Sequence, residues 1–322
     1  MEMHTFAMFK YLNMRLYLLS CLLPVLLLTV SSCSRPERNG TLATTTASDA
    51  GHSGYVHLPD SAFLYYDCHG NGQPLILLHG HSLDHRMWDE QLPALSEYFQ
   101  VYRVDLRGYG LSSQQVEGQP FVHADDVIAL MDLLGIGQAH VVGLSMGAFI
   151  AGDLVAMYPD RLLSCTLASG GIRSVKGPSE PMDSLESAQR DREIAALKAK
   201  GVDIYKKEWI EALISSGGTD RERMRAPLTQ MVNDWSAWQP LHKEARCYYA
   251  REAWDSLKVR RPAVPTLFLK GERDGGGKSS MMQYLPNSRQ VVLPNCGHMM
   301  NMDQPEAFNR ALLDFLLPLR EK

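Results

Sequence analysis

The residue whose sequence setting most clearly indicates a catalytic role is a serine with a glycine two positions before it and another two positions after it. Residues 143–147 read GLSMG and match the pattern G-x-S-x-G. They follow the apolar run 140–144 and precede a stretch with apolar residues at helical spacing. A strand, a sharp turn and a helix in this order lift a serine hydroxyl above the edge of a sheet. We therefore expect Ser145 to be a nucleophile rather than an ordinary serine at the start of a helix.

A serine nucleophile needs a base to remove its proton, and that base needs a carboxylate to orient it. Only two histidines follow Ser145, namely His242 and His298. His242 falls in a long segment without an expected strand, whereas His298 follows the last expected strand. A loop can carry His298 back over the edge of the sheet, so we expect it to be the base.

The acid is expected at the end of the apolar run 265–270. Asp274 lies in the segment Gly-Glu-Arg-Asp that follows this run, and Glu272 is the reserve candidate. With Asp274 as the acid, the order along the chain is Ser, Asp, His. This order differs from that of chymotrypsin and subtilisin and agrees with that of α/β hydrolases.

Two backbone N–H groups are candidates for stabilising an oxyanion. One belongs to Met146, directly after the nucleophile, and the other to His81 in the loop 79–82 that follows an earlier apolar run. We expect His81 to act through its backbone rather than its imidazole. His85 is expected to be a surface or loop-packing residue.

These residues lie at the ends of short apolar runs that alternate with helical patterns. The runs with strand character are 63–68, 74–79, 101–106, 140–145, 164–169, 265–270 and 289–294. The helical patterns cover 86–99, 121–134, 146–158 and 304–317. Several runs are apolar on both faces, as in strands covered by helices on two sides. The alternation predicts an α/β fold with a mostly parallel, doubly wound sheet.

The segment 173–258 interrupts this alternation. It has helical patterns but no convincing strand, and a structureless loop of this length is implausible in a compact domain. We predict a helical lid here, inserted into a core made of 55–172 and 259–322. Its aromatic side chains are expected to form the lid's own core more than to contact substrate: Tyr205, Trp209, Trp235, Trp238, Tyr248 and Tyr249.

The first 33 residues have the pattern of an export signal. An apolar run at 16–30 follows Lys10 and Arg15, and it is shorter than the roughly 20 residues that span a bilayer. The run ends before Cys33, in a sequence that resembles a bacterial lipoprotein box, so Cys33 is the expected lipidation site; Cys21 is a weaker alternative. Residues 34–54 are rich in Ser, Thr, Gly and Ala and are expected to be a flexible tether.

Composition excludes several other classes of protein. The chain has 322 residues with 45% hydrophobic and 21% charged residues, which is typical of a globular protein. Its formal charge of −4 leaves no basic surplus for binding nucleic acid. The six cysteines have no metal-ligand spacing, and the glycines at 271–277 do not match a dinucleotide-binding loop. We expect no metal and no cofactor.

From about residue 55 to 317 the chain resembles the α/β-hydrolase superfamily, in the branch with a lid after the sixth of about eight strands. The matching stretches are LLHGHSLDHRMWDEQ, YRVDLRGYGLSS, DDVIALMDLLGI, HVVGLSMGAF, MYPDRLLSCTLAS, LKGERDGGG and NCGHMMNMDQPEAFNRALLDFL. The resemblance implies an oxyanion donor at His81, an acid at Asp274 and a base at His298. A serine at 145 argues against the family's epoxide hydrolases and dehalogenases, whose covalent intermediate needs a carboxylate nucleophile.

The chain is similar to carboxylesterases and to hydrolases like 3-oxoadipate enol-lactonase, and this resemblance implies a serine hydrolase acting on a small or medium carboxylic ester or lactone. With the signal, it implies an enzyme anchored by lipid in a bacterial cell envelope. Two alternatives stay enzymatic: a carbon-carbon bond hydrolase of the β-diketone type and a cofactor-free haloperoxidase. A third is a non-hydrolytic binding protein on the same fold.

Overall fold

The computed structural model describes residues 51–174, 176–275 and 279–320. The predicted signal at 1–33, including Cys33, and most of the predicted tether lie outside these residues. Within them, no helix has the length and apolar character needed to cross a membrane.

An eight-stranded sheet forms the centre of the described part, in the order β1-β2-β4-β3-β5-β6-β7-β8. Strand β2 pairs antiparallel with β1 and β4, and every other neighbouring pair is parallel. The strands are β1 His52–His57, β2 Phe63–His69, β3 Pro74–Leu78, β4 Gln100–Val104, β5 Ala139–Leu144, β6 Leu162–Ala168, β7 Thr266–Gly271 and β8 Ser288–Leu293. The predicted mostly parallel, doubly wound sheet is confirmed.

Strand β1 is a correction to the predicted tether at 34–54, because it begins at His52. Sequence patterns did not indicate it, since Val56 is its only buried residue and the other positions are exposed or partly exposed. Its place is fixed by backbone pairing with β2, from His52 opposite Cys68 to His57 opposite Phe63. An edge strand with one buried side chain has no apolar alternation to detect.

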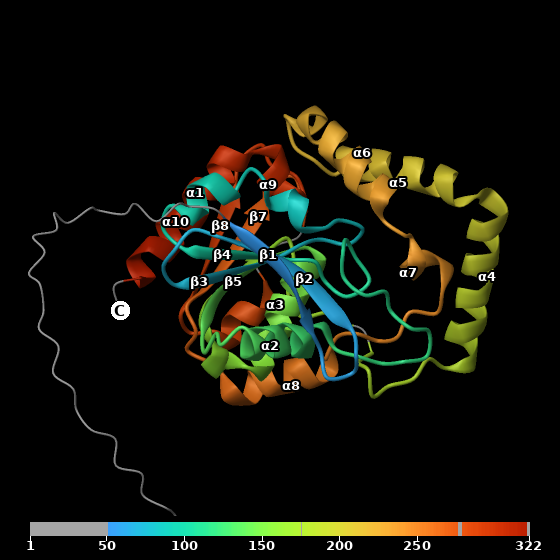
Figure 1. Cartoon of the computed structure of the whole chain (residues 1–322), viewed down its shortest axis with the longest axis horizontal. Coiled ribbons are helices and arrows are strands. Elements are labelled where there is room, and N and C mark those ends of the chain that lie inside the picture. Colours follow the sequence, from blue (N-terminus) through green and yellow to red (C-terminus); the bar gives the residue numbers. More distant parts are fainter. Residues whose placement is uncertain (1–50, 175, 276–278, 321–322) are drawn as a thin grey trace, which may run out of the picture. The chain divides into compact units, whose positions relative to one another are not determined.

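Helices cover both faces of the sheet (Figure 1). One layer contains α2 His123–Leu133, α3 Met146–Met157 and α8 Arg251–Arg260, and the other contains α1 Leu92–Ser96, α9 Met300–Asp303 and α10 Pro305–Leu316. The single helix predicted at 86–99 is instead a 3₁₀ turn, η1 His85–Trp88, followed by α1. Pro93 stands in the first turn of α1, where its missing N–H costs no hydrogen bond.

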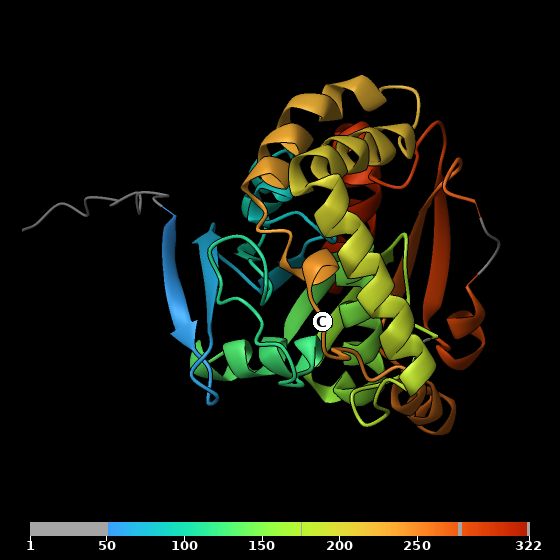
Figure 2. The same cartoon turned by 90° about the vertical axis from the view of Figure 1, so that its right-hand side faces the viewer.

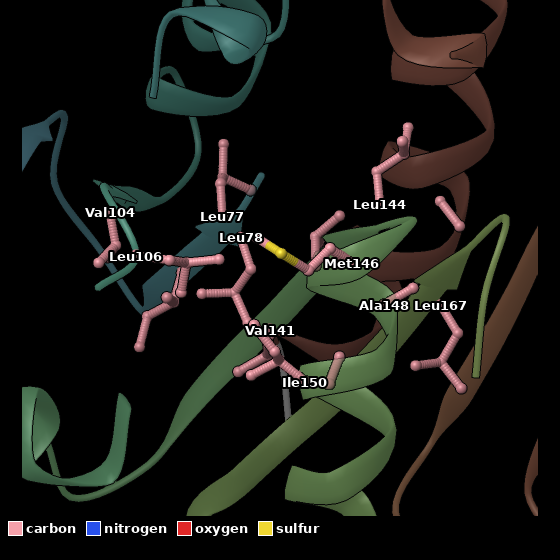
Figure 3. Packing of buried hydrophobic residues seen from close by; sticks show 14 of the residues in the cluster. Leu77, Leu78, Val104, Leu106, Val141, Leu144, Met146, Ala148, Ile150 and Leu167 are labelled. Carbon is pink, nitrogen blue, oxygen red and sulfur yellow. The ribbon is translucent and has the colours of Figure 1, made fainter. Parts of the chain in front are cut away.

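Apolar side chains hold the start of the helix that follows the GLSMG turn. Leu78 of β3, Val141 of β5 and Ile150 of α3 have no exposed surface, and Figure 3 shows them in one cluster with Met146. Burying each such side chain contributes on the order of 1.5–3 kcal/mol. This packing fixes the start of α3 against the ends of two parallel strands.

Four helices connect β6 to the segment before α8: α4 Ser184–Lys200, α5 Val202–Ser215, α6 Arg225–Asp234 and α7 Trp238–Leu241. This insertion lies on the right of the sheet in Figure 1 and faces the viewer in Figure 2. The predicted lid boundary at 258 is wrong, because 251–258 belong to α8, which packs on α3. An amphipathic helical pattern does not tell which neighbour covers its apolar face.

Candidate active site

Ser145 occupies a strained turn between β5 and α3. Its φ of 55° and ψ of −111° are unfavourable for a residue with a side chain, and the packing of the fully buried β5 holds them in place. Both flanking glycines are needed for this turn. A Cβ at Gly143 would overlap the carbonyl of Gly147, and a Cβ at Gly147 would overlap the carbonyl of Leu78. The turn therefore presents the Ser145 hydroxyl at the carboxyl end of the sheet.

The structure brings Ser145, His298 and Asp274 into one hydrogen-bonded row. His298 Nε2 lies 2.9 Å from Ser145 Oγ, and His298 Nδ1 lies 2.7 Å from Asp274 Oδ1. Because a carboxylate only accepts, Nδ1–H donates to Asp274 and the free Nε2 accepts from the Ser145 hydroxyl. This is the arrangement in which an imidazole can take the serine proton while a carboxylate stabilises the resulting charge.

Backbone contacts fix the loops that carry the histidine and the acid. The His298 N–H donates to the Ser216 carbonyl at 2.8 Å, and Ser169 Oγ donates to the His298 carbonyl at 3.0 Å. The Asp274 N–H donates to the Gly271 carbonyl at 3.1 Å, in a turn directly after β7. Ser216 follows α5, so the insertion also helps to position His298.

The competing candidates lie elsewhere. His242 stacks on Trp238 with ring centroids 4.5 Å apart, and its Nδ1 lies 2.8 Å from the Trp238 carbonyl. Glu272 accepts from the Asn295 N–H at 2.9 Å and makes no hydrogen bond or ion pair with His298. The structure therefore places only His298 and Asp274 in the row with Ser145.

The two predicted oxyanion donors lie beside Ser145. His81 and Met146 line one cavity with it, and neither backbone N–H donates to another group within the described parts of the chain. Met146 is the first residue of α3, where an N–H has no partner inside the helix. These two N–H groups can receive the negative charge that develops on a carbonyl oxygen under attack.

The His81 side chain is neutral. Burial, together with the charges of His79 and Arg173, lowers the pKa of its imidazole to about 4. Burial also raises the pKa of the Tyr109 phenol well above its usual value, and the oxygen of this phenol lies 2.8 Å from His81 Nδ1. Trp209 and Trp235 surround the same ring edge to face. The His81 imidazole is therefore a poor proton acceptor.

Two cavities open beside Ser145. One has a volume of about 440 Å³, and its lining residues are His81, Tyr109, Ser145, Met146, Phe149, Arg173, Lys176, Met182, Glu244, Ala245, Arg246, Cys247 and Tyr248. The other, of about 260 Å³, has Trp209 and Leu213 beside Ser145 and His298. Cavities of a few hundred Å³ hold small organic molecules. Ser145 lines both cavities, so a molecule bound in either one would lie beside this serine.

The aromatic residues of the insertion divide between two roles. Trp235 is buried, as expected of core, whereas Trp209 and Tyr248 line the cavities beside Ser145. The sequence pattern did not indicate Arg173 as a site residue. The one available signal was its position shortly after an apolar run at the carboxyl edge of the sheet, where Ser145 and Asp274 also lie.

One cluster of potential metal ligands occurs in the described part of the chain: Asp84, His85 and Asp105. Its atoms already have protein partners. Asp84 pairs with Arg86 at 2.6 Å, and Asp105 accepts from the backbone and ring nitrogens of His85 at 2.7 and 2.9 Å. His85 is thus half-buried and paired with Asp105, so of its two expected roles the structure supports loop packing. The four described cysteines are buried thiols without a disulfide partner among these residues: Cys68, Cys165, Cys247 and Cys296.

Comparison with known proteins gives consistent matches. The sequence profile described as "Alpha/beta hydrolase family" matches residues 75–311. The pimeloyl-[acyl-carrier protein] methyl ester esterase of Nitrosomonas europaea is 26% identical over 259 residues, which is 77% of this chain and 97% of that protein.

Two solved structures also superimpose on most of the chain. A hydrolase from Pseudomonas aeruginosa PA01 is 29% identical, with a TM-score of 0.60, and covers 83% of this chain and 99% of its own. A thermophilic esterase from Thermogutta terrifontis is 26% identical, with a TM-score of 0.62, and covers 84% and 99%.

Proposed function

The chain belongs to the alpha/beta hydrolase family, and from this premise we propose that it is a serine hydrolase that cleaves small or medium carboxylic esters or lactones. The observation that carries the proposal is the row of contacts from Ser145 Oγ to His298 Nε2 and from His298 Nδ1 to Asp274. The esterases among its relatives support the choice of a carboxylic ester.

The proposed reaction proceeds through an acyl-enzyme. His298 Nε2 takes the proton of Ser145 as Oγ attacks the substrate carbonyl, while Asp274 holds the imidazole in the required tautomer. The N–H groups of His81 and Met146 bind the oxyanion. His298 then gives its proton to the leaving alcohol, and water activated by the same imidazole releases the acid and restores Ser145.

The test is a panel of acyl esters, lactones and β-diketones assayed with the wild-type chain and with Ser145→Ala. We expect turnover of at least one ester or lactone and a loss of about 10³-fold or more in kcat/KM in the variant. Ser184→Ala, at an exposed serine at the start of α4, is the matched control and should retain activity.

The products separate the reaction types. An acid and an alcohol indicate ester hydrolysis, whereas an acid and a ketone indicate carbon-carbon cleavage. Full esterase activity in Ser145→Ala would refute the proposed nucleophile.

We further propose that the enzyme is anchored by lipid to a bacterial cell envelope through Cys33, a residue outside the described part of the chain. The apolar run 16–30 and the small residues before Cys33 support this location. Labelled palmitate should be incorporated into the wild-type chain in a bacterial host and not into Cys33→Ala. Equal labelling of the two proteins, or none in either, would refute the anchor.

A further inference from the structure

Arg173 is a charged residue in the proposed active site for which the hydrolytic reaction has no use. It follows β6, which neighbours the strand that carries Ser145, and it lines the larger cavity together with that serine. Its backbone thus leaves the sheet at the same edge as the nucleophile. A charge at this position meets whatever part of the substrate occupies the larger cavity.

The guanidinium of Arg173 is held by aromatic faces instead of an acid. Its central carbon lies 5.1 Å from the ring centroids of both Phe149 and Tyr248. No carboxylate lies within ion-pair distance of it within 51–174, 176–275 and 279–320, and no hydrogen bond joins it to these residues. Stacking on rings fixes the plane of a guanidinium and leaves its N–H edge available.

The two buried arginines of the described region, Arg103 and Arg107, are both paired. Arg103 contacts Asp67 at 2.5 Å, and Arg107 contacts Asp126 at 2.8 Å. Because a poorly solvated charge is costly without a partner, these pairs are the usual solution in a protein interior. Arg173 lacks such a partner, so an anion in the cavity would supply one.

Two further cations on the cavity wall are already neutralised. Lys176 contacts Asp183 at 3.2 Å and Glu186 at 3.0 Å, and Arg246 contacts Glu186 at 2.8 Å. They contribute little uncompensated charge to the cavity. Arg173 is thus the cation best placed for a ligand.

Glu244 is the opposing charge on the same wall. Its Oε1 accepts from Gln115 Nε2 at 3.0 Å, and its side chain makes no ion pair with Arg173. Burial raises the pKa of Glu244, although Gln115 and Arg173 act in the opposite direction. An ionised Glu244 would repel a bound anion, so its effect on binding should be opposite to that of Arg173.

We propose that Arg173 is a carboxylate-binding residue and that the substrate carries a free carboxylate in addition to the scissile ester, as in a half-ester of a dicarboxylic acid. This inference rests on the proposed function. The planar N–H edge of a stacked guanidinium matches the two oxygens of a carboxylate. Seating the carboxylate on Arg173 places the rest of the acyl chain in the cavity that leads to Ser145.

The first experiment compares two esters of equal chain length, monomethyl adipate and methyl hexanoate, which differ only in the terminal group. Arg173→Met retains an unbranched stem against the rings and removes the charge. We expect it to raise KM for monomethyl adipate about 10- to 100-fold, to change kcat less than about threefold, and to leave both constants for methyl hexanoate nearly unchanged. Arg173→Lys should recover part of the loss because it restores the charge without the planar fork.

Two further variants separate charge from packing. Arg289→Met is the matched control, because Arg289 also lies over an aromatic ring, Phe315, at 5.4 Å, but does not line the cavity. It should leave both esters unaffected. Glu244→Gln should lower KM for monomethyl adipate, since it removes a like charge.

The outcomes distinguish this inference from the proposed function. Equal losses for both esters in Arg173→Met, or a gain for the half-ester, would overturn the carboxylate-binding role. Where neither ester is hydrolysed by the wild type, binding of monomethyl adipate to Ser145→Ala is measured by calorimetry. Binding that is abolished by adding Arg173→Met would support the subsite, while the proposed function is judged on the full panel of esters and lactones. Absence of such binding would refute the subsite.

Discussion

Asp153→Asn is expected to change how the stability of the fold depends on pH. Asp153 lies in α3, eight residues after the nucleophile, and is 1% exposed. One carboxylate oxygen accepts from the Tyr249 N–H at 2.9 Å, and the other has no partner in the described part of the structure. The side chain therefore joins α3 to the segment before α8 at the expense of a poorly solvated charge.

Burial raises the pKa of Asp153 to about 7, with smaller contributions from Asp125 and Glu252 in the same direction. A carboxyl whose pKa is higher in the folded state stabilises the fold below its unfolded pKa of about 4. That stability is lost as pH rises through the folded pKa. Between pH 5.5 and the folded pKa of about 7, the wild type loses stability over about 1.5 pH units. Raising the pH from 5.5 to 8.5 therefore lowers its free energy of unfolding by roughly 2 kcal/mol.

The assay is urea unfolding of the wild type and Asp153→Asn at pH 5.5 and 8.5. Asparagine retains an oxygen for the Tyr249 N–H and carries no charge, and other titrations cancel in the difference between the two proteins. The free energy of unfolding of the variant relative to the wild type should increase by about 2 kcal/mol between these pH values. Asp191→Asn, at an exposed position in α4, should show no such change. An identical pH dependence for wild type and Asp153→Asn would refute the reasoning.

Three other predictions concern the site itself. Gly147→Ala should abolish soluble, folded protein, because the new methyl overlaps the Leu78 carbonyl; native circular dichroism and a wild-type melting temperature would contradict this. Asp274→Asn should lower kcat about 10³-fold or more, since an amide can donate to His298 and favour the wrong tautomer, and a loss below about tenfold would argue against the role of Asp274. Trp209→Phe removes the indole N–H that donates to Ser82 at 2.6 Å. In steady-state kinetics it should raise KM by a factor several-fold larger than that by which it lowers kcat. A larger effect on kcat than on KM would place Trp209 in the chemical step.

Much of the sheet followed from local sequence, because its central strands are buried on both faces. The bounds of β3, β5 and β7 fall within one residue of the apolar runs that predicted them. The three candidate catalytic residues could be predicted for the same reason, since Ser145, Asp274 and His298 each follow such a run. Parallel strands bring their carboxyl ends to one edge, so three positions far apart in the chain become neighbours.

The parts that could not be predicted depend on tertiary contacts. Strand β1 is set by pairing with β2, and α8 by packing on α3, and neither leaves a distinct local pattern. The aromatic contacts of Arg173 could not be predicted from its local sequence, because the rings that hold it, Phe149 and Tyr248, come from distant segments. The lowered pKa of the His81 imidazole likewise results from tertiary burial, with Tyr109, Trp209 and Trp235 packed around the ring.

Covalent labelling of Ser145 tests the central claim most directly. A fluorophosphonate reacts with a serine only when a neighbouring base activates it. Intact-mass and peptide-mapping measurements on the wild type should show one phosphonyl adduct, located on Ser145. His298→Ala should react at least about 10²-fold more slowly, and Ser145→Ala should not react. An unlabelled wild type, or an adduct that forms equally fast without His298, would contradict the account.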